Sequence, residues 1–245
     1  AVVQDETGEC VIVAIDYGQI EARVIAMASE DDNLVKAQWT DFDIHGVWYR
    51  RFVEGYPEFN EFLARQFALD VNDEKALFKV GRQEAKNKWV FPQFFGSSSY
   101  SCAHDLNLPE SFAKELAGEF WDTYPRVKKW QKRLITKWEK ELYVETLTGR
   151  RRRGPMTPNE IINHPVQGTA ADIVLDAWNR LTEYGIATDQ YEYIAPLNVH
   201  DDLTSFVPAA RVDPYIETAA RFMCDSHFTF INVPLVVEVS TGKSW

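Results

Sequence analysis

Cysteine is scarce in this sequence, and long apolar runs are missing from it. The only cysteines are Cys10, Cys102 and Cys224, and none belongs to a C-x-x-C pair. We therefore expect neither a zinc site nor a disulfide framework, and a reducing compartment fits best. No run of about 18 apolar residues occurs, so we expect no transmembrane helix and no membrane partner. The opening AVVQDETGEC has none of the regions of a signal peptide.

Positive charge is also in short supply, and it is unevenly placed. The 245 residues carry 26 Lys and Arg against 37 Asp and Glu, for a net charge of −11. Residues 76–155 reverse this balance, with 16 Lys and Arg against 9 Asp and Glu. This basic central third could bind an anion, or it could be a solvated helix face, and charge alone favours the latter.

The apolar patterning predicts an α+β protein with a sizeable core, because 45% of the residues are hydrophobic and 13% aromatic. A buried strand is expected at 11–15 and a helix from Ile20. Helices with breaks at EGYPEF, LDVND and Pro125 are expected up to residue 142. YVETLTGRRRRGP predicts a hairpin, followed by a helix that Gly185 would cap. The remaining expected elements are a buried hairpin at 195–208, a helix near 212–224 and a strand in PLVVEVSTG.

Carboxylates stand at the ends of two expected strands. Asp16 closes the run 11–15, and Asp201 and Asp202 lie in the turn of NVHDDL. If these strands are neighbours in one sheet, their carboxylates would form a site of hard oxygen ligands, which Mg²⁺ and Mn²⁺ prefer. A bound dication would also relieve the repulsion between like charges. The alternative is a polar hairpin tip without a ligand.

A second pattern lies in GRQEAKNKWVFPQFFG. Arg82 and Lys86 are spaced i, i+4 and share one helical face, and Phe91, Phe94 and Phe95 follow. Such a helix could hold a triphosphate at one end and stack on a base at the other. An ordinary amphipathic helix with a solvated basic end remains the alternative.

These segments together resemble family A DNA polymerases, the bacterial polymerase I type. DYGQIEARVIA (16–26) resembles motif A, RQEAKNKWVFPQFFG (82–96) motif B, and NVHDDL (198–203) motif C. Further matches occur in family order: DIH, YVETLTGRRR, NHPVQGTAAD and PLVVEVSTGKSW. The resemblance implies a right-hand polymerase palm, an antiparallel sheet with helices, that carries a largely helical fingers insertion. The implied domains are palm at 1–30, fingers at 31–142 and palm at 143–245.

The resemblance also implies an activity, the template-directed addition of dNTPs to a primer 3′-hydroxyl on primer-template DNA by a two-metal-ion mechanism. Asp16 and Asp201 would bind two Mg²⁺ ions, with Mn²⁺ as a substitute, and Asp202 would be an auxiliary carboxylate. Lys86 would complete the catalytic set as a proton donor to pyrophosphate. The motif A carboxylate, Glu21, would exclude a ribose 2′-hydroxyl and so favours a DNA polymerase over single-subunit RNA polymerases.

The resemblance assigns two further groups of residues. The expected nucleotide-binding residues are Gln19, Glu21, His45, Arg82, Lys86 and Phe91. The expected DNA-binding residues are Phe95, Arg150, Arg151, Asn163, Gln167 and His200. Phe95 would stack near the template base, whereas the others would contact the minor groove, the backbone or the primer terminus without reading sequence.

Motif B departs from the family pattern. Aligning FFG with the family's YG requires one extra residue after Lys86, and Pro92 cannot donate the hydrogen bond that a regular helix needs. We therefore expect a kink or π-bulge between Lys88 and Phe91. The alternative register uses Val90 and Phe94 in place of Phe91 and Phe95 and needs no insertion.

The chain begins at the strand before motif A. We therefore expect that a thumb and any exonuclease domain lie outside these 245 residues, in the same polypeptide or in a second one, as in a split or phage-like polymerase. A cytoplasmic protein of a bacterial or phage-infected cell is expected. A polymerase that copies RNA templates and a non-catalytic DNA-binding subunit are the alternative functions. A two-metal nuclease would need the carboxylates but not the cationic helix.

Overall fold

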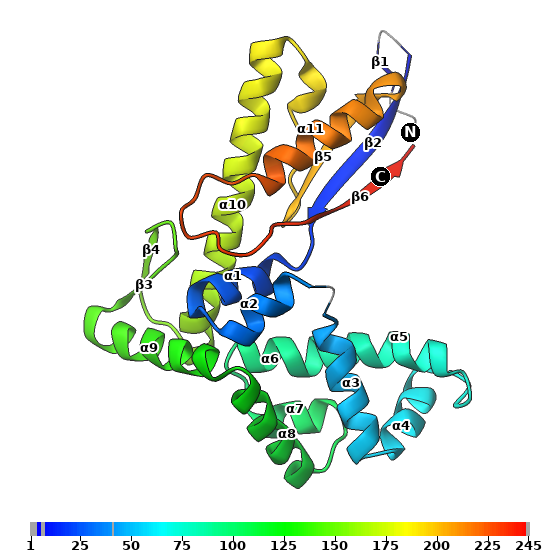
Figure 1. Ribbon diagram of the computed structural model, residues 1–245, viewed down its shortest axis with the longest axis vertical. Coiled ribbons are helices and arrows are strands. Elements are labelled where there is room, and N and C mark those ends of the chain that lie inside the picture. The colour runs from blue at the N-terminus through cyan, green and yellow to red at the C-terminus, as the bar shows by residue number, and fades with distance from the viewer. Residues whose placement is uncertain (1–3, 6–7, 41, 244–245) are drawn as a thin grey trace. The chain divides into compact units, whose positions relative to one another are not determined.

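The computed structural model describes residues 4–5, 8–40 and 42–243, so the last two residues of the expected C-terminal match lie outside it (Figure 1). The contacts between Cα atoms divide the chain into two compact units. The first unit comprises 1–28, 145–152 and 164–245, and the second comprises 29–144 and 153–163. Helices predominate and the strands pair antiparallel, which confirms the α+β class. No helix in the described ranges is both long and apolar enough to span a bilayer.

The first unit is built on a four-stranded sheet with β2 (Gly8–Tyr17) at its centre. β2 pairs antiparallel with β1 (Gln4–Asp5), β5 (Asp202–Pro208) and β6 (Val237–Gly242). The predicted strand is thus confirmed, and its alternate residues Val13, Ile15 and Tyr17 are fully buried. Burial of these side chains fixes the register, because a slip by one residue would turn them to the other face.

Three helices accompany this sheet: α1 (Ile20–Ser29), α10 (Pro158–Thr188), which begins in the second unit, and α11 (Val212–Cys224). α11 packs on β2 and β5. The hydroxyl of Tyr17 donates to the carbonyl of Met223 at 2.7 Å, and that of Tyr215 donates to Ser205 Oγ at 2.8 Å. These buried hydrogen bonds hold α11 on the sheet. The helices predicted at Ile20 and at 212–224 are confirmed.

The predicted cap at Gly185 is wrong, because α10 continues through it to Thr188. Asp189 takes the left-handed conformation instead, at φ 56°, and the amide of Gln190 donates to the carbonyl of Gly185 at 2.8 Å. This is the bonding of a Schellman motif. A Cβ on Gly185 would lie 2.9 Å from the carbonyl oxygen of Gln190. A glycine is therefore needed at position 185 because the chain at Gln190 passes close to it, and not because the residue adopts a left-handed conformation.

The predicted buried hairpin at 195–208 is half wrong. Only its second arm is a strand, β5, while the first arm makes a single bridge between Leu197 and Thr204. Leu197 and Val199 are exposed, at 41% and 43%. The apolar run before the two aspartates therefore has the composition of a buried strand without its packing.

The second unit is helical and confirms the breaks predicted from the sequence. The breaks at 56–57 and 68–73 separate α3, α4 and α5, and Pro125 is the first residue of α9. Its elements are α2 (Asp32–Gln38), α3 (Ile44–Gly55), α4 (Glu58–Phe67), α5 (Glu74–Ala85), a π-helical turn η1 (Lys86–Val90), α6 (Phe91–Phe94), α7 (Ser99–Asp105), α8 (Glu110–Thr123) and α9 (Pro125–Glu141). The predicted hairpin follows as β3 (Tyr143–Glu145) and β4 (Arg151–Arg153).

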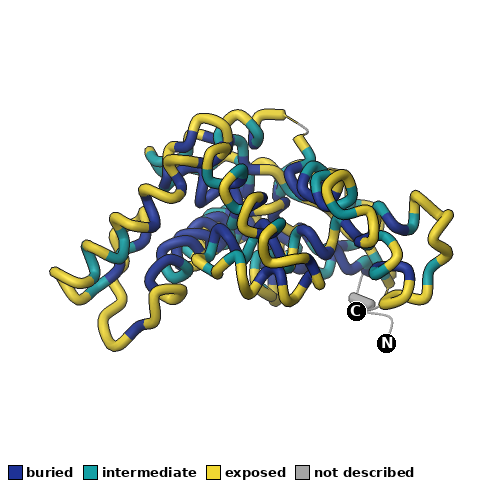
Figure 2. Tube along the Cα trace, turned by 90° about the horizontal axis from the view of Figure 1, so that it is seen from below, coloured by how far each residue is buried: buried dark blue, intermediate teal, exposed yellow. Residues whose placement is uncertain are grey.

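Aromatic side chains fill the interior of the second unit. Trp48, Phe52 and Trp89 form a continuous cluster, with ring centroids 5.6 to 6.0 Å apart, and Phe120 lies 5.2 Å from Trp48. Buried and exposed residues alternate along the helices of the chain (Figure 2). Large rings bury much apolar surface, so this cluster fixes how α3, η1 and α8 pack.

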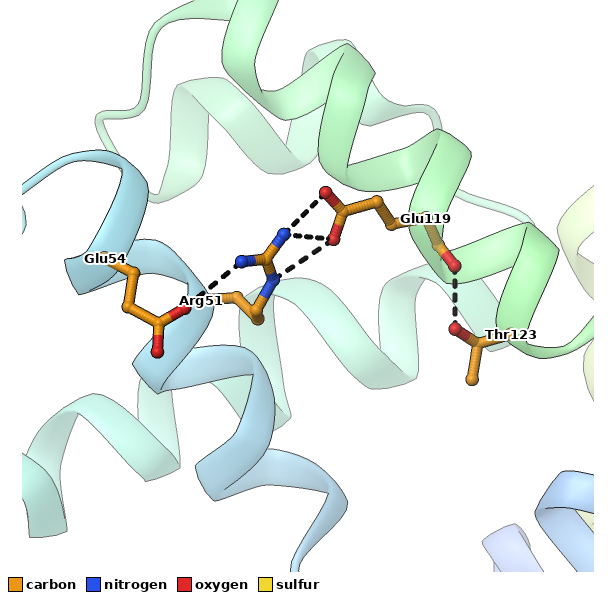
Figure 3. Close-up of polar contacts among 4 residues, drawn as sticks. All are labelled: Arg51, Glu54, Glu119 and Thr123. Carbon is orange, nitrogen blue, oxygen red and sulfur yellow. Dashed lines mark hydrogen bonds and ion pairs between the residues drawn. The ribbon is translucent and has the colours of Figure 1, made fainter.

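A charged network reinforces the contact between α3 and α8. Arg51 donates three hydrogen bonds to Glu119, from Nε to Oε2 at 3.1 Å and from Nη2 to Oε1 and Oε2 at 2.6 Å each, and a fourth to Glu54 at 3.1 Å (Figure 3). The hydroxyl of Thr123 donates to the main-chain carbonyl of Glu119, which lies one turn earlier in α8. The planar guanidinium joins the two helices with a bidentate geometry that a lysine could not supply.

Replacing Gly81 with alanine should destabilise the fold by roughly 1–3 kcal/mol. A Cβ at this position of α5 would lie 2.1 Å from the ring of Tyr49, which is itself buried and bonded to Asn60. Gly118→Ala in α8 is the matched control, since a Cβ there meets nothing within 4 Å. It should stabilise the helix by about 0.5–1 kcal/mol. Equal shifts of the two variants in urea unfolding would contradict this account.

Candidate active site

The register of β2 with β5 brings the predicted carboxylates together. Asp16 is paired with Asp202, and the amide of Tyr17 donates to the carbonyl of Asp201 at 3.2 Å. The side-chain carboxyls of Asp16 and Asp201 lie within hydrogen-bonding reach of each other. Residues 185 positions apart in the sequence therefore share one end of the sheet.

These carboxyl groups repel one another. Partial burial and then the negative charge of Asp201 raise the pKa of Asp16 to about 6, and Asp202 and Glu238 act in the same direction. Because Asp16 is an exposed residue, the neighbouring carboxylates are the stronger physical reason. A dication would remove this repulsion, so the donor set fits a hard metal ion.

Two carboxylates are a usual protein contribution to a Mg²⁺ site, because the ion keeps several waters and takes substrate oxygens. Across the described residues, no three His, Cys, Asp or Glu side chains are gathered as a ready-made metal site. The remaining ligands would accordingly come from solvent and from substrate.

The structure separates the two aspartates of motif C. The carboxylate of Asp202 accepts hydrogen bonds from the amide of Val199 at 3.0 Å and from the hydroxyl of Thr204 at 3.5 Å. The amide side chain of Asn198 donates to its carbonyl at 2.6 Å. Asp202 thus fastens the turn, in which His200 takes a left-handed φ of 62°, while the carboxyl of Asp201 points to Asp16.

A hollow of about 580 Å³ adjoins the carboxylates in the first unit. It brings together four of the predicted residues, and the side-chain amide of Gln167 lies 3.5 Å from Glu21 Oε1. Gln19 is exposed at the start of α1, with φ 55°. The lining residues are Ile20, Glu21, Gln167, Ala170, Ala171, Val174, His200 and Asp201.

The predicted irregularity of motif B is confirmed in the second unit. The helix adopts one π turn over Lys86–Val90, and the amide of Phe91 donates to the carbonyl of Lys86, five residues back. The turn begins two residues earlier than expected. It absorbs the extra residue, and Pro92 falls just inside the short α6, where its missing N–H costs little.

The π turn also determines which aromatic residues are accessible. Val90 and Phe94 are buried, at 1% and 0% exposure, and so cannot stack on a base. Phe91 and Phe95 are half-exposed and stack on each other, with centroids 6.1 Å apart. This geometry supports the register with Phe91 and Phe95. The ammonium of Lys86 lies over the Phe91 ring at 5.6 Å.

His45 of α3 is buried beside these cations. Its ring lies 5.7 Å from that of Phe91, and neither ring nitrogen has a hydrogen-bond partner among the described residues. Burial, and then the charges of Arg82 and Lys86, lower the pKa of His45 to about 4. The imidazole is therefore neutral at pH 7. Arg82 itself is paired with Asp43 at 2.8 Å.

The predicted DNA-binding arginines already have protein partners. Arg150 bonds to Asp172 and to the carbonyl of Gly168, each at 2.9 Å, and Arg151 bonds to Glu145. The side-chain oxygen of Asn163 is buried without a partner among the described residues. Arg150 therefore holds the hairpin to α10, which its sequence position did not indicate.

Sequence reasoning missed Gln131. This buried side chain of α9 donates to the carbonyls of Gln93 and Phe94 at 3.1 and 2.7 Å, which satisfies the end of the motif B helix. The available signal was one polar residue within the apolar stripe of Val127, Trp130 and Leu134.

Arg23 was also missed. Its guanidinium donates to the carbonyls of Gly18 and Pro234 at 2.8 and 2.6 Å and fixes the chain after β2.

Comparisons with known proteins identify the family of this chain. The model of DNA polymerase family A matches residues 1–245. DNA polymerase I of Chloroflexus aurantiacus is 30% identical over 250 residues, covering 95% of this chain and 24% of that protein. The thermostable DNA polymerase I of Thermus thermophilus is 30% identical over 249 residues, covering 96% of this chain and 27% of that protein.

A solved structure shows the same fold. The polymerase domain of Pol1 from M. smegmatis, in complex with DNA primer-template and dNTP, superposes with a TM-score of 0.75 at 24% identity. The match covers 99% of this chain and 41% of that one. The chain belongs to DNA polymerase family A. It spans about a quarter of the length of the curated relatives it matches.

The stability of the chain should depend on pH through His45. Its folded pKa, about 4, lies below its ordinary value of 6.5, so the unfolded chain takes up the proton first. Stability should therefore be full above pH 6.5 and fall by up to about 3 kcal/mol as the pH drops towards 4. Urea unfolding at pH 7 and 4.5 should show a smaller loss in His45→Gln. The exposed His104→Gln should behave as wild type, and equal losses in all three proteins would contradict the assignment.

Proposed function

We propose that the chain is the nucleotide-adding core of a DNA polymerase. It would join a dNTP to a primer 3′-hydroxyl on a DNA template and release pyrophosphate. The observation that carries the proposal is the convergence of Asp16 and Asp201 beside the hollow that Glu21, Gln167 and His200 line. The cationic motif B helix of the second unit adds the groups that a triphosphate requires.

Asp16 and Asp201 would hold two Mg²⁺ ions, or Mn²⁺ in their place. Bound there, the ions would make the primer 3′-hydroxyl a better nucleophile and neutralise charge on the phosphates. The protein's own part is to keep two carboxylates at one end of a rigid sheet. Asp202 would orient the turn that presents Asp201, because its carboxylate is already bonded to the main chain of that turn.

The second unit would bind the triphosphate. Lys86 would pair with its oxygens and donate a proton to the departing pyrophosphate. Arg82 would exchange part of its pairing with Asp43 for phosphate, which a guanidinium can bind in a bidentate manner. Neutral His45 has an N–H without a partner in the described structure, and a phosphate oxygen would satisfy it.

The remaining residues would select and position the substrates. Glu21 would occupy the space of a ribose 2′-hydroxyl, and Phe91 would pack on the sugar and base. Phe95 would stack near the template base. Gln167 and His200 face the hollow beside the carboxylates, and they would contact the primer–template duplex there. Gln19, Asn163 and the two hairpin arginines would supply further contacts.

The proposed partners are primer-template DNA and dNTPs, which are present in the solved complex of the M. smegmatis polymerase domain. The curated relatives are about four times as long as this chain. We therefore include in the proposal a thumb-containing segment, in the same polypeptide or in a second one.

Asp201→Asn should abolish metal binding at the sheet end, because the amide cannot offset a dication's charge. Titration with Mn²⁺, followed by electron paramagnetic resonance, should show the loss in the 245-residue chain without DNA. Nucleotide addition to a primed template, with a thumb-containing segment supplied if the chain needs one, should fall by a factor on the order of 10³. Asp202→Asn is the matched control, since its amide oxygen can still accept from Val199. Equal Mn²⁺ affinity in wild type and Asp201→Asn would refute the metal assignment.

Lys86→Ala should slow the chemical step by a factor on the order of 10² or more and weaken dNTP binding. Single-turnover extension at varied dNTP concentration separates the two effects. Lys75→Ala, three turns earlier at the exposed start of α5, removes the same charge and should leave both constants unchanged. If Lys86→Ala weakened only DNA binding, the lysine would bind template and not triphosphate.

A further inference from the structure

α9 is the most basic helix of this acidic protein. Seven of its 17 residues are Lys or Arg and two are Glu, in a chain of net charge −11. Its apolar face is already covered, because Leu134, Ile135 and Trp138 pack against a small core in the same unit, formed by Val144, Met156 and Ile161. The face turned away from this core is therefore the one that meets solvent.

Five cations of α9 lie on that face in one line. We call them the basic stripe: Lys129, Lys132, Arg133, Lys137 and Lys140. Counted from Lys129, the others follow at three, four, eight and eleven residues, which places them along one side of a helix. With a rise of 1.5 Å per residue, the stripe is about 16 Å long. All its members except Lys129 line a hollow of about 400 Å³ together with Thr136 and Glu141.

Most of this charge is not neutralised by the protein. Lys137 lies 3.9 Å from Glu141 and over the ring of Tyr143 at 5.1 Å. Within the described ranges, the other four members of the stripe have no ion pair, and all four are exposed. Arg126, outside the stripe on the same helix, is by contrast paired with Asp32 at 2.8 Å. Like charges one turn apart repel, so the stripe is stabilised by an extended anion.

We propose that the basic stripe of α9 binds the phosphate backbone of a single DNA strand, outside the nucleotide-adding site. A strand carries one phosphate per 3.4 Å of its axis, so about four or five phosphates would face the 16 Å stripe. The residues that line the hollow are four cations, Thr136 and Glu141, and none of them is an aliphatic or aromatic residue that would receive an apolar anchor of an acidic peptide. Contacts to phosphate alone make this binding independent of sequence.

The opposite side of α9 connects the stripe to the motif B helix. Gln131 donates to the carbonyls of Gln93 and Phe94, directly before Phe95. A strand on the stripe would therefore lie on the element that holds the end of that helix. The inference takes the identity of the nucleic acid, DNA, from the proposed function, but it requires neither metal ion nor dNTP.

The test is direct binding of a fluorescein-labelled, mixed-sequence single-stranded oligonucleotide of about 20 nucleotides, measured by anisotropy without Mg²⁺ or dNTP. The stripe variant combines Lys132→Gln, Arg133→Gln and Lys140→Gln. The control variant combines Lys36→Gln, Arg65→Gln and Lys114→Gln, which removes the same charge from exposed positions of α2, α4 and α8. Circular dichroism and thermal melting verify that both variants fold.

We expect the stripe variant to bind at least about tenfold more weakly at low salt, and the slope of log K against log salt to fall by about 2, or 0.7 per lost phosphate contact. The control variant should bind within about twofold of wild type. Equal weakening of both variants would reduce the effect to net charge and overturn the proposal, as would unchanged binding by the stripe variant. Displacement of the DNA by an equally charged poly-glutamate at equal concentration would assign the stripe to acidic protein instead.

These outcomes are separate from those for the proposed function. Loss of primer extension in Asp201→Asn leaves DNA binding to α9 untouched, because the stripe contains none of the residues assigned to metal or triphosphate. Conversely, a stripe that binds no DNA would leave the Mn²⁺ titration unchanged.

Discussion

The antiparallel register of β2 with β5 is the constraint on which the first unit depends. It sets Asp16 opposite Asp202 and the carboxyl of Asp201 beside that of Asp16. Such a cluster of like charges is unfavourable by itself, and burial of Val13, Ile15 and Leu203 in the same strands stabilises the register against it. A dication bound beside these carboxylates would relieve this repulsion.

In the second unit, a local irregularity decides the arrangement of the aromatic residues. The π turn at Lys86–Val90 shifts every later side chain around the helix, so that Val90 and Phe94 face the core while Phe91 and Phe95 reach the surface. The aromatic cluster around Trp89 holds one side of this helix, and Gln131 holds its end. A regular helix would exchange the buried and accessible rings.

Acidic and basic residues are concentrated in different parts of the chain. The first and last thirds are acidic and contribute the carboxylates of the sheet end, whereas the basic middle third contains motif B and α9. The overall charge of −11 would by itself argue against a nucleic-acid partner. Local distribution matters more, because electrostatic attraction between exposed charges is screened over about 8 Å in physiological salt.

Patterns that depend on neighbouring residues were predictable from the sequence. Periodicity located β2, α1 and α11, proline and glycine marked the helix breaks, and one extra residue with Pro92 indicated the π turn. The carboxylates of the candidate site, too, could be named, since the motifs that contain them are contiguous. These features depend on the side-chain periodicity of a helix or a strand, which can be read from a short segment of sequence.

Only the tertiary structure decided the features that depend on distant contacts. Gly185 lies inside a helix, and residues 190–194 pack closely against it. Leu197 and Val199 are exposed although their segment is apolar. Arg150 forms an ion pair with Asp172. The two carbonyls that Gln131 satisfies lie 37 and 38 residues away. Hydrogen bonds and packing across such separations leave no periodic trace in the sequence, so which residues meet is settled only when the chain has folded.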